Sequence, residues 1–440
     1  LPAIPMVCHN HLMWVQKLRS NSMKKPFFLN LPCKNLLLCL LTYGISLSSI
    51  AQMSHSSHST MKLGSQTKTE CSSTNLECAN AANPFLSEDG KLHLIWTANG
   101  SVSYAQSIDL GKSWSSALEI ANHGKALDTG SDARPQIVVN RQGQILIAYA
   151  FFKDKNWNAQ VNYSVSEDGG KSFTTPKSIV NDTSSQRFPS LVIAPNGSVF
   201  LSWIDKRLIQ ASKEKGGKAL GASLAFAWSD DFGKTFSIEQ IANREICECC
   251  RIGASFDRSG QPTVIYRSIF EGGIRDHAMQ AFTKNNAGKI ERVSVDDWKT
   301  DACPHHGPSI AITSSNTKHV AWFTQGSQRT GLFYAKTLNS NHSFSSPLRI
   351  GTQDANVSRP SLISHQNSVW LAWKEFNGKE TMIWLQNSSD DGITWSTPKM
   401  IAKTSEYSDH PVLIKGNQEI YLSWLTEKES YQIIPIAKLP

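Results

Sequence analysis

After residue 51 the sequence contains no long hydrophobic run, no nucleotide-binding loop and almost no segment with the apolar spacing of a helix. These absences argue against a membrane-spanning domain and against a helical or nucleotide-binding fold. Residues 1–51 hold five basic and no acidic residues, so their removal lowers the formal net charge from +8 to +3. Such a nearly neutral chain is a poor partner for nucleic acid.

The one leucine-rich run lies near the start of the sequence. Met23, Lys24 and Lys25 precede the apolar segment NLLLCLLTYGISLSSIA, which ends at Ala51. A basic start, a leucine-rich centre and small residues at the end are typical of a secretory signal peptide. We predict an upstream extension over residues 1–22, a signal peptide over residues 23–51, and a periplasmic or secreted protein without a stable membrane span. A membrane anchor is the alternative.

Cysteine is scarce, and its distribution is informative. Six cysteines follow residue 51: Cys71, Cys78, Cys247, Cys249, Cys250 and Cys303. An even number in an exported protein favours disulfides. Cys71 and Cys78 make a natural pair within residues 52–82, which we predict to be a Ser/His/Met-rich linker followed by an N-terminal closing segment. The stretch QMSHSSHSTMKLG is typical of a flexible linker, and a tether for a soft metal is the alternative.

The remaining sequence, residues 83–440, repeats. One strand in each unit ends on an aromatic residue at intervals of 51 to 63 residues: Trp96, Tyr149, Trp203, Tyr266, Trp322, Trp373 and Trp424. A short strand, often opened by proline, precedes each of these strands, and a third strand follows it. This pattern predicts an all-β fold, a β-propeller of four-stranded antiparallel blades. Seven blades are favoured and six are the alternative. The last unit ends after three strands, so the segment before residue 83 is expected to supply the fourth.

Four turns between third and fourth strands share the pattern S-x-D-x-G-x-[ST]-[WF]. They cover Ser107–Trp114, Ser166–Phe173, Ser229–Phe236 and Ser388–Trp395. The aspartate can accept hydrogen bonds from turn amides, the glycine supplies a positive φ, and the aromatic side chain is expected to pack between blades.

The other face of such a propeller carries the links between blades and the loops that leave the second strands, and this face is rich in cations. We predict that five arginines bind an anionic group on a ligand there: Arg134, Arg187, Arg251, Arg275 and Arg359. The forked guanidinium group suits a carboxylate or sulfate. Solvated loop charge is the alternative for any one of them.

The four turns resemble Asp-boxes, also called BNR repeats, and residues 83–440 resemble the sialidase (neuraminidase) superfamily of Asp-box propellers. The resemblance implies an exo-glycosidase acting on acidic, sialic-acid-type sugars, with three arginines that grip the sialate carboxylate. By position, it implies a clamp of Arg134, Arg251 and Arg359, an acid/base at Asp205 or Asp276, and Tyr407 as nucleophile beside Glu406. The first unit departs from the family's Arg-Ile-Pro element, because Asn83 precedes Pro84 there.

The segments ICECCRI and DACPHHGPS open the fourth and fifth units, so they are expected to lie side by side on the cation-rich face. Disulfides between these segments are favoured, and the protein then needs no cofactor. The alternative is a copper or zinc site made of thiolates and imidazoles. Its candidate ligands are Cys247, Cys249, Cys250, Cys303, His305 and His306.

Three functions therefore compete. The first is an exported, sialidase-like hydrolase of acidic sugars. The second is a non-catalytic propeller that binds an acidic glycan, another anionic small ligand or a protein partner. The third is a periplasmic propeller that binds copper or zinc at the cysteine and histidine residues.

Overall fold

The computed structural model of the chain describes residues 71–217, 219–338 and 343–439. Contacts between residues divide the chain into two units, Leu1–Thr67 and Lys68–Pro440, and the second contains all the described residues. The predicted upstream extension, the signal peptide and the linker up to residue 70 lie outside them. Within the described ranges, no helix has the length and apolar character needed to cross a membrane.

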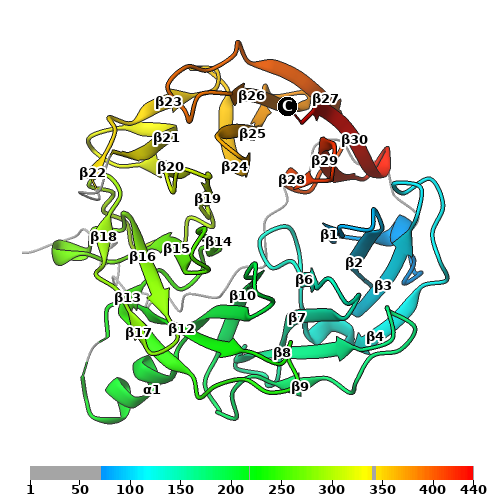
Figure 1. Cartoon of the computed structure of the whole chain (residues 1–440). Coiled ribbons are helices and arrows are strands. Elements are labelled where there is room, and N and C mark those ends of the chain that lie inside the picture. Colours follow the sequence, from blue (N-terminus) through cyan, green and yellow to red (C-terminus); the bar gives the residue numbers. More distant parts are fainter. Residues whose placement is uncertain (1–70, 218, 339–342, 440) are drawn as a thin grey trace, which may run out of the picture. The chain divides into compact units, whose positions relative to one another are not determined.

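The second unit is a seven-bladed β-propeller, so the favoured blade count is confirmed (Figure 1). Blade 1 contains β1 (Ala81–Leu86), β2 (Leu92–Ala98), β3 (Ser101–Ser107) and β4 (Leu118–Asn122). Blade 2 contains β5 (Leu127–Asp128), β6 (Gln136–Val139), β7 (Ile145–Phe152), β8 (Ala159–Ser166) and β9 (Lys177–Ser178). Blade 3 contains β10 (Gln186–Ile193), β11 (Val199–Asp205), β12 (Ala222–Ser229) and β13 (Gln240–Ile246).

The remaining blades follow in chain order. Blade 4 contains β14 (Gly253–Phe256), β15 (Pro262–Arg267), β16 (His277–Thr283), β17 (Asn286–Ala287) and β18 (Glu291–Arg292). Blade 5 contains β19 (Ser309–Ile312), β20 (Lys318–Gln325), β21 (Thr330–Leu338), β22 (Ser343–Phe344) and β23 (Leu348–Ile350). Blade 6 contains β24 (Asn356–His365), β25 (Ser368–Phe376), β26 (Thr381–Ser388) and β27 (Lys399–Thr404). Blade 7 contains β28 (Val412–Lys415), β29 (Glu419–Thr426) and β30 (Ser430–Lys438). The described helices are short: η1 (Leu76–Cys78), η2 (Gly124–Ala126), α1 (Arg207–Glu214) and η3 (Glu271–Gly273).

Each blade is antiparallel, with its strands paired in chain order. In blade 2 the inner strand is divided, since β5 and β6 both pair with β7. In blades 4 and 5 it is the outer strand that is divided, into β17 and β18 and into β22 and β23. In blade 2 this division leaves residues 129–135 as a loop at the inner edge of the blade, and this loop contributes to the candidate functional site.

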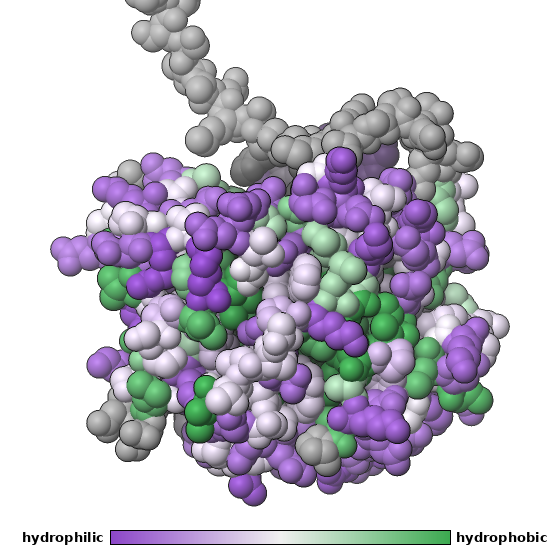
Figure 2. Space-filling view, turned by 90° about the horizontal axis from the view of Figure 1, so that it is seen from above, coloured by the Kyte–Doolittle hydropathy of each residue, from purple (hydrophilic) through white to green (hydrophobic). Residues whose placement is uncertain are grey.

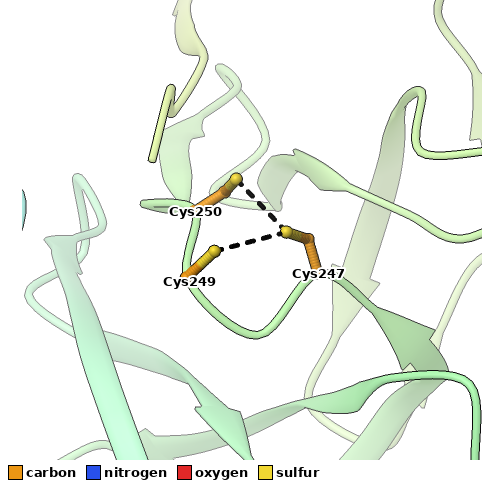
Figure 3. A group of neighbouring side chains, drawn as sticks. All are labelled: Cys247, Cys249 and Cys250. Carbon is orange, nitrogen blue, oxygen red and sulfur yellow. Dashed lines mark hydrogen bonds between the residues drawn. The ribbon is translucent and has the colours of Figure 1, made fainter. Parts of the chain in front are cut away.

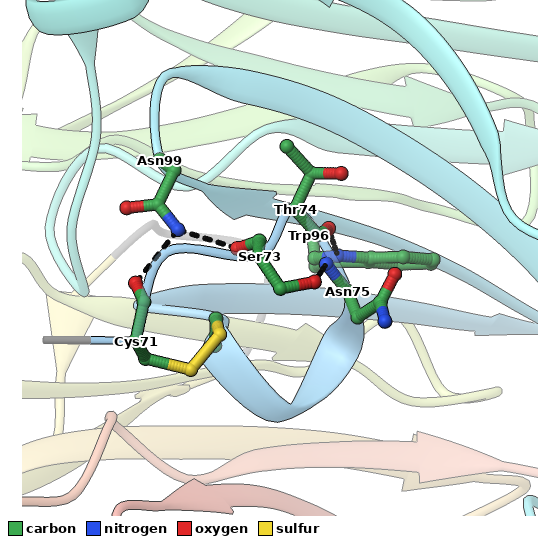
Figure 4. The surroundings of a disulfide bond; sticks show 7 residues. Cys71, Ser73, Thr74, Asn75, Trp96 and Asn99 are labelled. Atoms are coloured by element: carbon green, nitrogen blue, oxygen red, sulfur yellow. Dashed lines mark hydrogen bonds between the residues drawn. A yellow bond between two sulfur atoms is a disulfide. The ribbon is translucent and has the colours of Figure 1, made fainter. Parts of the chain in front are cut away.

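The segment before β1 does not supply a fourth strand to blade 7 within residues 71–82. A disulfide joins Cys71 to Cys78 and holds this segment as a compact loop around η1 (Figure 4). The loop is tied to blade 1, because the Trp96 indole donates to the Thr74 carbonyl at 3.0 Å and the Asn99 amide donates to the Cys71 carbonyl at 2.8 Å. Within residues 71–82, η1 contacts β30, but no strand pairs with β30.

The seven aromatic residues of the second strands are among the largest side chains that are fully buried in the core. All are at most 2% exposed: Trp96, Tyr149, Trp203, Tyr266, Trp322, Trp373 and Trp424. Each buries roughly 150–250 Å² of surface. Hydrophilic residues cover most of the surface seen in Figure 2, and hydrophobic residues lie between them in smaller groups. One large buried aromatic side chain per blade therefore packs with aliphatic residues in the core.

The four repeated turns have one common hydrogen-bond arrangement. In the turn after β8, the Ser166 hydroxyl donates to the Asp168 carboxylate at 2.8 Å and accepts the Gly170 amide at 2.8 Å. The same carboxylate accepts the Ser172 amide at 3.0 Å and the Ser172 hydroxyl at 2.6 Å. The turns after β3, β12 and β26 repeat these contacts. Each turn is therefore a rigid local unit.

The aromatic residue that closes each turn packs against a tyrosine of the preceding blade, as the sequence predicted. The ring pairs are edge to face, with centroids 4.8 to 5.9 Å apart: Trp114 with Tyr431, Phe173 with Tyr104, Phe236 with Tyr163, and Trp395 with Tyr334. Such pairs add roughly 0.5–1.5 kcal/mol each beyond the area they bury. The turns thus fasten neighbouring blades to one another.

Candidate functional site

The links between blades and the loop from β5 to β6 meet at one end of the central channel. The strands next to the axis are β1, β6, β10, β14, β19, β24 and β28, which contact one another around the ring. They enclose a cavity of about 280 Å³ lined by residues of all seven blades. Four prolines that lie in the first strands or directly before them line it: Pro189, Pro308, Pro360 and Pro411.

Asp132, in the loop between β5 and β6, is the hub of this end of the channel. Its Oδ1 lies 2.8 Å from Arg359 Nη1, 3.3 Å from Arg251 Nε and 3.3 Å from His410 Nε2. Burial would raise the pKa of the Asp132 carboxyl, but His410, Arg359 and Arg251 outweigh burial and hold that pKa far below its usual range. Asp132 is therefore a carboxylate held by two guanidinium groups and by the His410 imidazole.

The loop that carries Asp132 belongs to blade 2, yet it reaches distant blades. Arg134 makes a two-pronged ion pair with Asp409, which precedes blade 7, at 3.0 Å and 2.6 Å. Ser131 hydrogen-bonds the Tyr407 hydroxyl at 2.9 Å, also beside blade 7. With Arg251 leading into blade 4 and Arg359 in blade 6, these contacts place residues 129–135 across the mouth of the channel.

Bulges in two first strands determine the direction of side chains near the channel mouth. Arg359 has φ of 58° at a bulge in β24, where the pairing with β25 shifts between Ser358 and Ser361. Phe188 has φ of 53° at the corresponding bulge in β10. Positive φ is unfavourable for such residues and persists only where the surrounding contacts hold it. For Arg359, the hydrogen bond to Asp132 is one of these contacts.

Cations exceed carboxylates at this site. We define the mouth cluster as Asp132, Arg134, Arg251, Arg359, Lys374 and Asp409. Its four cations and two carboxylates leave two positive charges in excess. Burial, together with Arg359 and Arg134, lowers the pKa of Lys374 to about 8, against the opposing effect of Asp409. Arg251 Nη2 is buried with no hydrogen-bond partner among the described residues.

The two histidines beside the mouth cluster are neutral. Burial, followed by the positive charge of Arg359, lowers the pKa of His306 to about 3 and the pKa of His410 well below its usual value. The His306 ring stacks on Phe323 with centroids 4.1 Å apart. These imidazoles can accept or donate hydrogen bonds to a ligand, but they add no charge.

Tyr407 and Glu406 are both exposed, and Tyr407 is 52% exposed. In the described part of the chain, no hydrogen bond joins the Glu406 carboxylate to the Tyr407 hydroxyl, which instead bonds Ser131. Lys374 Nζ lies 6.0 Å from the centre of the Tyr407 ring. Burial of the hydroxyl raises the pKa of Tyr407. The structure thus places Tyr407 at the mouth cluster, but without a carboxylate to activate it.

The two predicted acids are buried away from solvent. Asp205 is 0% exposed and accepts hydrogen bonds from the Trp203 indole at 3.0 Å and from Arg207 at 3.0 and 3.1 Å. Asp276 is 1% exposed and accepts from the Arg292 guanidinium and from the amides of residues 296–298. Both carboxylates are saturated with protein donors in this structure.

The other two predicted arginines are also engaged. Arg187 makes a two-pronged ion pair with Asp128, both contacts at 2.7 Å, and stacks on Phe188 at 4.5 Å. Arg275 donates to the sulfur of Cys247 at 3.5 Å. The structure therefore gathers Arg134, Arg251 and Arg359 into the mouth cluster and places Arg187 and Arg275 in separate contacts.

Three cysteines gather in the link between β13 and β14, and all are free thiols (Figure 3). The Cys247 sulfur lies 3.7 Å from that of Cys249 and 3.4 Å from that of Cys250. Cys303, in the link before β19, is an exposed free thiol that interacts with Cys249. The predicted disulfides between these two links are not formed in this structure, although the predicted proximity of the links is present.

Sequence reasoning missed the two carboxylates of the mouth cluster. Asp132 and Asp409 follow a serine and shortly precede an [RH]-Pro pair, in the segments SDARP (131–135) and SDHP (408–411). The repeated Ser-Asp before these pairs could have marked the two aspartates as candidate site residues. Their role as partners of the arginines, however, depends on which side chains meet across the channel.

The fold and the mouth cluster define a seven-bladed propeller with a cation-rich channel mouth. No protein-family model matches the sequence, and no curated protein does either. Solved structures do match, among them polysaccharide lyases, trans-sialidases and an arabinanase.

A polysaccharide lyase of family PL25, an ulvan lyase, has a TM-score of 0.54 and 12% identity, over 80% of this chain and 90% of that chain. The same enzyme bound to -[GlcA(1-4)Rha3S]- has a TM-score of 0.53 over the same shares at 12% identity. The polysaccharide lyase Uly1 has a TM-score of 0.51 and 10% identity, over 82% and 90% of the two chains. At these identities the likeness shows the fold alone.

Proposed function

We propose that this propeller binds an acidic carbohydrate at the mouth cluster and holds the ligand's carboxylate or sulfate between Arg251 and Arg359. The observation that carries the proposal is the position of Asp132. Its carboxylate already sits among Arg359, Arg251 and His410, so the cluster has the geometry to hold an oxyanion.

The charge of the site supports an anionic ligand. The four cations of the mouth cluster outnumber its two carboxylates, Asp132 and Asp409, and leave an excess of two positive charges. Arg251 Nη2 also has no hydrogen-bond partner among the described residues. A buried donor of this kind gains a charge-assisted hydrogen bond when an anion binds. The exposed Tyr407 ring offers an apolar face on which a sugar can rest.

The fold neighbours support a carbohydrate as the carrier of the anion. The PL25 lyase was solved with -[GlcA(1-4)Rha3S]-, a repeat that holds both a uronate carboxylate and a sulfate. By analogy with that protein, the ligand proposed here is an acidic glycan rather than a free inorganic anion.

Catalytic turnover of the bound sugar is a more specific hypothesis than binding alone. Hydrolysis of sialosides in the way that the sequence resemblance implies would use Tyr407 as nucleophile. In the described part of the chain, however, the Tyr407 hydroxyl has no hydrogen bond to Glu406, and Asp205 and Asp276 are saturated. We therefore propose binding as the primary function. Tyr407 and Lys374 are the groups at the mouth cluster able to exchange protons with a bound sugar.

An exported location, periplasmic or secreted, is part of the proposal and follows from the predicted signal peptide over residues 23–51. Fractionation of the native cells, with mass spectrometry of the mature N-terminus, tests it. A cytoplasmic protein that retains residues 23–51 would contradict it.

Binding is best tested by calorimetry with a sulfated uronate oligosaccharide, sialyllactose and a neutral oligosaccharide of equal length. We expect binding of an acidic ligand that weakens with added salt, and a loss of at least tenfold in affinity for Arg251→Met and Arg359→Met. Arg141→Met is the matched control, since Arg141 is exposed and pairs with the exposed Glu88.

Two results would contradict the proposal. One is equal affinity for neutral and acidic oligosaccharides, and the other is unchanged affinity in both folded arginine variants. Incubation with a fluorogenic sialoside and with polyuronates, followed for released product, tests turnover in the same preparation.

A further inference from the structure

The three cysteines in the link between β13 and β14 occupy a well-defined place in the fold. The link is anchored to the end of β15, because the Cys247 amide donates to the Arg267 carbonyl at 2.9 Å and Ile246 bridges to Ser268. The cysteines are 1%, 4% and 2% exposed in chain order. Their sulfurs are thus held in place by the backbone around them.

The sulfurs are arranged around one point rather than as a pair. All three lie within 4.8 Å of one another, and Cys247 is 3.4 Å from one neighbour and 3.7 Å from the other (Figure 3). Four sulfurs at the usual zinc distance of about 2.3 Å from a tetrahedral centre are about 3.8 Å apart. The observed spacing is close to this value. Cys303 lies on the exposed neighbouring link and interacts with Cys249, but it lies outside the group of three, so its link must move for it to act as a fourth sulfur.

The surroundings supply positive charge without a matching carboxylate. Arg275 Nη1 donates to the Cys247 sulfur at 3.5 Å. Arg267 is 1% exposed, donates to the carbonyls of Arg275, His306 and Phe323, and lies 4.3 Å from the centre of the Trp298 ring. Neither guanidinium has a carboxylate within ion-pair distance in the described ranges. A buried cation normally has an anionic partner, and a metal–thiolate complex carries negative charge.

We propose that Cys247, Cys249 and Cys250, with Cys303 as fourth sulfur, bind one thiophilic metal ion of closed electronic shell, Zn²⁺ or Cu⁺. Sulfur ligands select these ions over the oxygen-binding cations. The guanidinium groups of Arg267 and Arg275, which have no carboxylate partner in the described ranges, then neutralise the anionic complex. The ion joins the link that leads into blade 4 to the link that leads into blade 5, beside Arg251 of the mouth cluster.

This inference is independent of the proposed carbohydrate function, since no ligand of the metal belongs to the mouth cluster. Disulfides are the rival state of the same sulfurs. Two bridges would consume all four thiols and leave Arg267 and Arg275 without an anion, whereas a single ion uses both the sulfurs and the guanidiniums.

The test uses the mature chain purified without oxygen. Metal analysis and competition with chromophoric chelators are expected to give one Zn²⁺ or Cu⁺ per chain. Loading with Co²⁺ is expected to give an intense thiolate-to-metal charge-transfer band. Cys247→Ser and Cys250→Ser should each lose the ion and the band. Cys303→Ser distinguishes the two metals, because Zn²⁺ requires a fourth ligand and Cu⁺ is satisfied by three sulfurs.

A double variant, Cys71→Ser with Cys78→Ser, removes two sulfurs elsewhere and should keep the ion. The Co²⁺ spectrum of the unaltered protein does not depend on whether any variant folds. The proposal is overturned if that protein binds no ion tightly, if Cys247→Ser binds as well as the unaltered chain, or if peptide mapping finds the four sulfurs in disulfides.

Discussion

The Asp132 carboxylate of blade 2 accepts a hydrogen bond from the Arg359 guanidinium of blade 6 at 2.8 Å, across the mouth of the channel. The two residues are 227 positions apart in the sequence. This contact, with those of Arg251 and His410, makes the loop over residues 129–135 part of the mouth cluster at which we propose that the ligand binds. The loop therefore links the stability of the propeller to the ligand that we propose.

Asp132→Asn removes the negative charge and keeps the shape of the side chain. Two partly buried guanidiniums then lose their counter-ion, so we expect the free energy of unfolding to fall by about 3 kcal/mol. Thermal denaturation measures this loss. Added sulfate or acetate should raise the melting temperature of the variant more than that of the unaltered protein, because an external anion can replace the carboxylate.

The matched control for that experiment is Asp89→Asn, since Asp89 pairs with Lys91 at 2.8 Å on the surface. Exposed pairs contribute little, so its melting temperature should stay nearly unchanged. Equal effects of sulfate on Asp132→Asn and on the unaltered protein would argue against an oxyanion position at Asp132.

The pKa of Lys374, lowered to about 8, predicts how ligand binding depends on pH. Above pH 8 the ammonium group loses its proton, so the mouth cluster loses one positive charge. Affinity for an acidic oligosaccharide should therefore fall between pH 7 and pH 9, as calorimetry can measure. Lys374→Arg keeps its charge over this range and should flatten the profile.

The same lowered pKa has a defined effect on stability. Between pH 8 and 10.5 the unfolded chain keeps a proton on Lys374 that the folded chain has lost, so the contribution of this residue to stability rises with pH in that window.

For the affinity prediction, a pH profile of ligand affinity that is flat in the unaltered protein would contradict the predicted role of Lys374.

The repeated turns offer a comparison between adjacent glycines. Gly170 has φ of 86°, and a Cβ added there would lie 2.6 Å from the Tyr104 ring of blade 1. Gly169 also has a positive φ, 73°, but nothing lies within 4 Å of an added Cβ. Gly170→Ala should therefore lower the free energy of unfolding by about 1–3 kcal/mol more than Gly169→Ala. Similar denaturation midpoints for the two variants would contradict this packing role.

Asp205→Asn tests whether this buried carboxylate is structural. The change removes one of the two carboxylates that pair with Arg207, since Glu239 remains at 2.6 Å, and weakens the acceptor for the Trp203 indole, so we expect about 1–3 kcal/mol of destabilisation. Ligand affinity in the folded fraction should be unchanged, as measured by calorimetry. A stable Asp205→Asn variant that had lost turnover would instead support the acid/base role implied by the sequence resemblance.

Several features of the site had signals in the sequence. The repeat placed Arg134, Arg251 and Arg359 at equivalent positions near the axis, and the structure brings these three together. The acidic residue two positions after the tryptophan, at Asp205 and Glu375, accepts the indole N–H of Trp203 and Trp373. This repeated Trp-x-acid pattern could have indicated a structural role for Asp205.

The sequence by itself determined the strand repeat, the number of blades and the packing of the turn aromatics, because these depend on local spacing and on residues one blade apart. Only the tertiary structure decided that Asp132 and Asp409 hold the arginines and that three sulfurs of one link gather around a point. Closing the ring brings together side chains more than a hundred residues apart, and their directions depend on bulges such as that at Arg359. The spacing of residues in the sequence shows neither which distant side chains meet nor in which direction they point.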